Sequence, residues 1–207
     1  MYSKTGIFNL ALSALFLQKK IADSETDTSK ETLILSTHWD IAWNTGLQEL
    51  DTDSIAVTEA LELIWSTPNV HWRFAYKYPQ KCAFLRRLVP QDGGELTDDE
   101  LSTIDKKISR FMGEKAILTN EANAYAEYIP NDIQATDLNA EEALFIAYKL
   151  ARLCLPLIIG KDSDNVAKLL EVRYEQAHLN ARAKSAKETT IYSPDWQRSE
   201  FVKHRLS

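Results

Sequence analysis

The chain has 207 residues, of which 44% are hydrophobic and 26% are charged, so it can bury a core as one substantial domain or two small ones. Its net charge of −6 argues against a free-standing DNA-binding protein, which would be basic overall. The two cysteines, Cys82 and Cys154, lie far apart without a CxxC pair, which argues against a cysteine zinc site and a disulfide framework.

The first third of the chain predicts two helices. The apolar run at residues 7–17 is too short to span a bilayer and lacks the features of a signal peptide, so we expect a helix over residues 4–18. Thr28 with Glu31 predicts a capping box for a second helix over residues 28–50. Its apolar stripe contains two tryptophans that we expect to pack in the core: Leu35, Trp39, Ala42, Trp43, Leu47 and Leu50.

The middle of the chain, about residues 55–130, predicts a smaller antiparallel β part. Residues 55–64, IAVTEALELI, fit either a strand or a helix. In WRFAYKY, residues 72–78, aromatic and basic side chains alternate, which indicates an aromatic face for the core and a cationic face for solvent or a neighbouring subunit. Pro79 separates this strand from a second extended segment at residues 82–89.

Two more strands are expected at residues 108–118 and 124–129, joined by the polar turn TNEAN. Asn139 with Glu142 then predicts the cap of a helix over residues 140–158. This helix is apolar on nearly every side, which is typical of the central helix of a bundle.

The last helix is expected over residues 163–186, and an extended interaction tail over residues 187–207, where several large apolar side chains occur without helical spacing. The sequence therefore predicts a mainly α member of the α+β class. Residues 1–186 would form a single domain with a bundle of about four helices and a smaller antiparallel β-sheet part.

Motifs for enzymatic chemistry are missing from the sequence. The four histidines lie in separate predicted elements, and no GxSxG, Walker or GxGxxG motif occurs. We therefore predict no catalytic, metal-binding or cofactor-binding residues, and no cofactor.

The charges are unevenly distributed. Between Asp23 and Glu62 the chain has ten acidic residues and one basic residue, Lys30. From Arg182 to Arg205 it has six basic residues against three acidic ones. These ends can be two solvated surfaces, or they can be complementary surfaces of neighbouring subunits or of this chain and another protein.

Five stretches follow one another in an order that resembles a known family. They are NLALSALFL with DSETDTSKE and the tryptophan-bearing helix, WRFAYKYPQKC, ILTNEANAYAEYI, EEALFIAYKLARLCLPLIIG and SPDWQRSEF. Together they resemble the phage head-to-tail connector proteins, and among these the tail tubular protein A, or adaptor, type of short-tailed phages.

The resemblance implies a structural virion protein of the neck or tail, assembled in the cytoplasm of the bacterial host. It would form a homo-oligomeric ring, expected to be dodecameric, that joins the portal protein to the tail nozzle or tube protein. The ring would line the channel through which DNA passes without sequence-specific binding, and it would act neither as an enzyme nor at a membrane.

Two groups of residues are expected to serve such a ring. In the C-terminal tail, aromatic and basic side chains would contact a neighbouring subunit or the portal. Acidic residues from the first third would face the channel and repel DNA. The two groups are Tyr192, Trp196, Arg198, Phe201 and Arg205 in the tail, and Asp23, Glu25, Asp27, Asp51 and Asp53 for the channel.

Two alternatives remain open at this stage. The first is a nucleic-acid-binding module that uses residues 72–88, with stacking aromatic side chains and the cations Arg73, Lys77, Arg86 and Arg87. The second is a hydrolase that uses scattered acidic residues.

Overall fold

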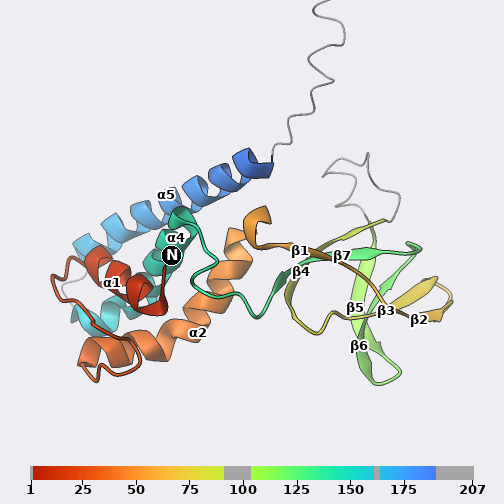
Figure 1. The fold of residues 1–207 in the computed structure, drawn as a ribbon, viewed down its shortest axis with the longest axis horizontal. Helices are drawn as coiled ribbons and strands as arrows, with labels where there is room; N and C mark the ends of the chain where they lie inside the picture. Colours follow the sequence, from red (N-terminus) through yellow and green to blue (C-terminus); the bar gives the residue numbers. More distant parts are fainter. Residues whose placement is uncertain (1, 91–103, 161–163, 190–207) are drawn as a thin grey trace, which may run out of the picture.

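The computed structural model describes residues 2–90, 104–160 and 164–189, which form a helical lobe and a β lobe (Figure 1). The helical lobe contains α1 (Lys4–Ala14), α2 (Lys30–Leu50), α4 (Ala140–Ile158) and α5 (Asp164–Thr189). A short 3₁₀ helix, η1 (Asp53–Ile55), leads into the β lobe. Its strands are β1 (Val57–Ala60), β2 (Leu63–Ser66), β3 (Phe74–Lys77), β4 (Cys82–Val89), β5 (Lys106–Phe111), β6 (Glu114–Thr119) and β7 (Tyr125–Pro130).

The prediction of a mainly α fold with one smaller β-sheet part is wrong. Of the described residues, 46% are helical and 23% are in strands, and these strands form two antiparallel sheets in a mixed α+β fold. One sheet has the strand order β1-β7-β4 and the other has the order β2-β3-β6-β5. The segment that fitted either a strand or a helix contains β1 and the start of β2, which belong to different sheets.

The single strand expected at residues 108–118 is a hairpin of β5 and β6. Its turn is made by Met112 and Gly113, which both have positive φ angles of 52° and 87°. Two consecutive residues with positive φ suit the tight turn that matches the twist of paired strands. The apolar pattern runs through Met112, so it did not reveal the turn.

The helical bundle is built around α4, as the apolar pattern predicted. α1, α2 and α5 all pack against α4, whose Ala143, Ala147 and Ala151 are fully buried. The predicted capping box of α4 is confirmed, because the Asn139 side chain accepts from backbone N–H groups and Glu142 accepts from the Asn139 N–H at 2.9 Å.

The starts and ends of the other helices differ from the predictions. The helix predicted for residues 4–18 ends at Ala14, and the capping box predicted at Thr28 is wrong because α2 begins at Lys30 after the N-cap Ser29. Glu31 instead pairs with Lys19 at 2.5 Å. α5 begins and ends close to its predicted residues, but most of the predicted tail, from residue 190 onward, lies outside the described residues.

Each lobe has its own hydrophobic core. Residues of all four described helices form the helical core, and Trp39 and Trp43 of α2 pack half-buried against it with stacked rings 5.0 Å apart. In the β core, Tyr76 is buried with side chains from both sheets, including Leu88 and Ile117. The aromatic face predicted for residues 72–78 thus contributes to a core.

Gly46 sets how closely α2 approaches α4. A Cβ at this position would lie 2.3 Å from Cδ1 of the fully buried Ile146. We expect Gly46→Val to lower the free energy of unfolding by about 1–3 kcal/mol through overpacking. At Gly6 in α1, a Cβ would meet only Oγ of Ser3 at 3.5 Å, so Gly6→Val should lower the free energy of unfolding clearly less. Urea unfolding of both variants measures the two free energies. Equal losses of unfolding free energy in the Gly46→Val and Gly6→Val variants would contradict a tight contact between α2 and α4.

Candidate functional site

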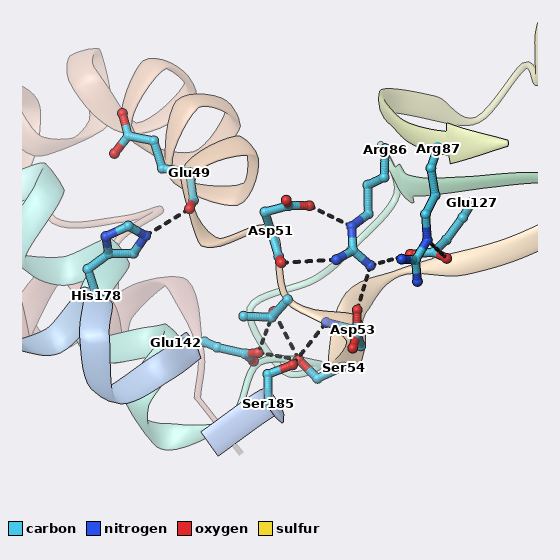
Figure 2. Close-up of polar contacts among 11 residues, drawn as sticks. Glu49, Asp51, Asp53, Ser54, Arg86, Arg87, Glu127, Glu142, His178 and Ser185 are labelled. Carbon is cyan, nitrogen blue, oxygen red and sulfur yellow. Dashed lines mark hydrogen bonds and ion pairs between the residues drawn. The ribbon is translucent and has the colours of Figure 1, made fainter. Parts of the chain in front are cut away.

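The candidate site is the polar junction between the two lobes, built on residues 51–56. Asp51 ends α2 with a left-handed backbone (φ 43°), and η1 then turns the chain towards β1. Side chains from β4, β7, α4 and α5 converge on this segment (Figure 2).

Arg86 of β4 forms the β-lobe side of the junction. Its guanidinium donates to Oδ1 of Asp51 at 2.5 Å, to Oδ1 of Asp53 at 2.7 Å and to the carboxylate of Glu127 on β7 (Figure 2). It also donates to the backbone oxygen of Asp51 at 3.2 Å, and Arg87 donates to the other oxygen of Glu127 at 2.7 Å. The Arg86 side chain is only 14% exposed, so water screens these ion pairs weakly.

The acidic surroundings keep Arg86 charged. Burial disfavours its positive charge, but the hydrogen bonds and attraction of Asp53, Asp51 and Glu127 outweigh burial and raise the pKa of the guanidinium. Three carboxylates around one guanidinium leave a local excess of negative charge, which Arg87 reduces through its bond to Glu127.

Glu142 of α4 forms the helical-lobe side. It is fully buried, and the oxygen not used in the capping box accepts hydrogen bonds from the hydroxyls of Thr52, at 2.8 Å, and Ser54. Oγ of Ser185 on α5 accepts from the backbone N–H of Asp53 at 2.9 Å. The same short segment is therefore bonded to β4, α4 and α5.

A second polar group lies one turn earlier, at the end of α2. Glu49 pairs with Lys149 of α4 at 2.5 Å and accepts from the hydroxyl of Tyr174, while Nε2 of His178 lies 2.9 Å from the Glu49 backbone oxygen. Partial burial opposes ionisation of Glu49, but its bonds with Lys149 and Tyr174 lower its pKa. This group fastens α2 to α4 and α5.

The arrangement of the junction suits a structural link better than a reaction centre. Every carboxylate named above already accepts from a cation, a hydroxyl or a backbone N–H. Burial raises the pKa of the Cys154 thiol to about 12, which suppresses its nucleophilic form. Within the described ranges, no group of three or more His, Cys, Asp and Glu side chains is placed to hold a metal ion.

The structure separates the five acidic residues predicted to face a channel into two groups. Asp51 and Asp53 lie in the junction, bound to Arg86. Asp23, Glu25 and Asp27 lie in the connection before α2, at the opposite end of a 21-residue helix that is about 32 Å long. The five predicted tail residues lie outside the described residues: Tyr192, Trp196, Arg198, Phe201 and Arg205.

The cations of the alternative nucleic-acid strand also divide into two groups. Arg86 and Arg87 are bound to carboxylates in the junction, so they belong to the internal link between the lobes. Arg73 and Lys77 lie elsewhere, Arg73 directly before β3 and Lys77 at its end. The sequence showed the Arg86–Arg87 pair but not its partners, because these depend on the pairing of β4 with β7.

Comparison with known proteins finds no family model that matches the chain and no match among curated proteins. Among the described helices, none is long and apolar enough to cross a membrane.

The junction predicts a large cost for removing its central cation. Arg86→Met should lower the free energy of unfolding by about 3 kcal/mol, because Asp51, Asp53 and Glu127 would face one another without a counter-charge. Lys81→Met breaks the exposed pair with Asp132 and should cost less than about 1 kcal/mol. If urea unfolding gives similar losses of unfolding free energy for Arg86→Met and Lys81→Met, the ion pairs of Arg86 do not stabilise the fold.

Glu142 gives an independent test from the helical side. Glu142→Ala removes half of the capping box and the acceptor for Thr52 and Ser54, so we expect a loss of about 2 kcal/mol. Glu141→Ala removes a first-turn acid that only complements the helix dipole, and should cost below about 1 kcal/mol. Thermal unfolding measures the stability of both variants. A larger loss for Glu142→Ala supports its role in linking the lobes, whereas equal losses would mean that Glu142 acts only as a first-turn acid of α4.

Proposed function

We propose that the protein is a structural virion subunit, a head-to-tail adaptor that forms a ring between the portal and the tail nozzle or tube and lines the DNA channel. The ordered motifs resemble that family, and the junction is suited to holding two lobes together. The observation that carries the proposal is a pair of unlike, exposed apolar faces on the helical lobe.

The first face, the α5 outer stripe, consists of Leu169, Val172 and Leu179. Their spacings of three and seven place them on one side of the helix, and Val172 and Leu179 are 63% and 66% exposed. The opposite side of α5 packs into the core through residues that include Leu170 and Tyr174. α5 therefore has three exposed apolar side chains on the side that the bundle does not cover, with the exposed Gln176 among them.

The second face, the α2 outer face, consists of Leu33, Thr37 and Ile41. Leu33 and Ile41 are each 57% exposed, and Thr37 between them satisfies its hydroxyl by donating to the Leu33 backbone oxygen at 2.8 Å. Isolated exposed apolar side chains are ordinary on a surface, but repeated helical spacing on two helices is typical of contact surfaces.

The two helices that bear these faces also differ in net charge. α2 has three acidic residues and one basic residue, whereas α5 has five basic and four acidic residues. A contact between the α5 outer stripe of one subunit and the α2 outer face of the next would bury both stripes and bring opposite net charges together. A contact between two unlike surfaces repeats around a rotation axis, and it closes into a ring when the rotation fits.

A ring also needs subunits of constant shape, because a small change in angle accumulates from one subunit to the next. The bonds of Arg86 and Glu142 to the junction segment support a fixed angle between the lobes. With the helical lobes in contact around the ring, the β lobes would project in one direction and could contact the portal or the tail.

The proposal predicts that one charge in the α5 outer stripe will impair assembly. Leu179→Glu would place a charge in the apolar contact with Leu33 and Ile41, so we expect the concentration needed for ring formation, alone or on purified portal rings, to rise at least about tenfold. Analytical ultracentrifugation with and without portal rings measures this change.

Leu63→Glu is the matched control, because Leu63 is 50% exposed on edge strand β2 of the β lobe. We expect it to form contacts between helical lobes like the unmodified protein, so in the absence of portal rings it should assemble at the same concentration. A chain that stays monomeric with portal rings present, or a Leu179→Glu variant that assembles normally, would refute this mode of assembly.

A further inference from the structure

A pocket lies at the tip of the β2–β3 hairpin, far from the junction and from both helical faces. The hairpin is at the right-hand end of the molecule in Figure 1. Its pocket, called the hairpin pocket below, has a volume of about 540 Å³. The lining residues come from the hairpin loop and from the end of β6: Thr67, Asn69, Val70, His71, Trp72, Arg73 and Asn120.

The hairpin pocket contains no carboxylate, although the whole chain has a net charge of −6. Arg73 is exposed and has no ion-pair partner among the described residues. His71, also exposed, adds a ring nitrogen that can donate a hydrogen bond. The charge of the pocket therefore suits an anion.

Two asparagines hold the loop and supply further donors. Oδ1 of Asn69 accepts from the backbone N–H groups of His71 and Trp72 at 2.9 and 3.1 Å, and Oδ1 of Asn120 accepts from that of Arg73 at 3.0 Å. Because each amide oxygen binds the backbone, each NH₂ group remains as a donor for a ligand. The loop is thus fixed before any ligand arrives.

Aromatic side chains lie beside these donors. Trp72 lines the pocket and is half-buried, so part of its ring is accessible. Trp65 of β2, which pairs with Ala75 of β3, lies on the same hairpin outside the lining of the pocket. Trp65 is 53% exposed. Accessible indole rings next to a cation suit a nucleobase and its phosphate.

We infer that the hairpin pocket binds single-stranded nucleic acid, with a phosphate held by Arg73 and His71 and an unpaired base stacked on Trp72. A single strand fits better than a duplex, because stacking on an indole requires a base that is free of its partner. This binding needs only one hairpin, so it does not depend on the proposed ring.

The experiment uses the full chain and a fluorescein-labelled oligothymidylate of about ten nucleotides, followed by fluorescence anisotropy. The unmodified protein should bind it and lose affinity between about 50 mM and 200 mM salt. Arg73→Gln should weaken binding about tenfold and reduce the slope of log K against log salt by about one. Trp72→Leu should weaken binding by a similar factor with an unchanged slope, because it removes stacking and leaves the charge.

Lys81→Gln is the control, since it removes an exposed cation of the β lobe that pairs with Asp132 and lies outside the hairpin pocket. It should bind like the unmodified protein. The inference is overturned if the unmodified protein does not bind the oligonucleotide at the lower salt concentration, or if Lys81→Gln and Arg73→Gln weaken binding equally. Tighter binding of a duplex of the same length would also overturn it. Failure of ring assembly would leave these results unaffected.

Discussion

The neutralisation of buried charge between the lobes is the constraint on which the described structure depends. Arg86 and the buried Glu142 both bind the short segment that follows α2, although they do not contact each other. Arg86 binds Asp51 and Asp53 of this segment. Glu142 accepts hydrogen bonds from Thr52 and Ser54. A charge with low exposure requires its partners, so the two lobes cannot separate at this point without exposing or isolating these groups. These bonds thus restrict the relative position of the two lobes.

Some local patterns in the sequence predicted the structure correctly, although the Thr28–Glu31 capping pattern did not, and the sequence failed where the pairing of strands decides the arrangement. Asn139 with Glu142 predicted the capping box of α4, and the apolar surface of that helix predicted its central place. The two-sheet arrangement was missed because β1 and β2, although separated by only two residues, belong to different sheets: β1 pairs with the distant β7 and β2 with the neighbouring β3. For the same reason the contact between Arg86 and Asp53, which are 33 residues apart, was not predictable from the sequence.

The proposed roles divide between the lobes. The helical lobe has the apolar faces that would contact neighbouring subunits, and the β lobe has a cationic, aromatic hairpin tip at its far end. An adaptor requires this division, because assembly contacts and contacts with nucleic acid or other virion components must not compete for one surface. The bonded junction between them would let a contact made at one lobe orient the other.

The order of the elements along the chain has a consequence for biosynthesis. α1 and α2 precede the β lobe and α4 and α5 follow it, so the β lobe is an insertion into the helical lobe. On the ribosome, the β lobe would emerge complete while α1 and α2 still lacked the helix around which they pack. Their apolar surfaces would stay uncovered until α4 emerged. A chaperone that binds nascent chains would therefore meet this protein chiefly through its N-terminal helices, and premature association of subunits would be delayed until α5 was made.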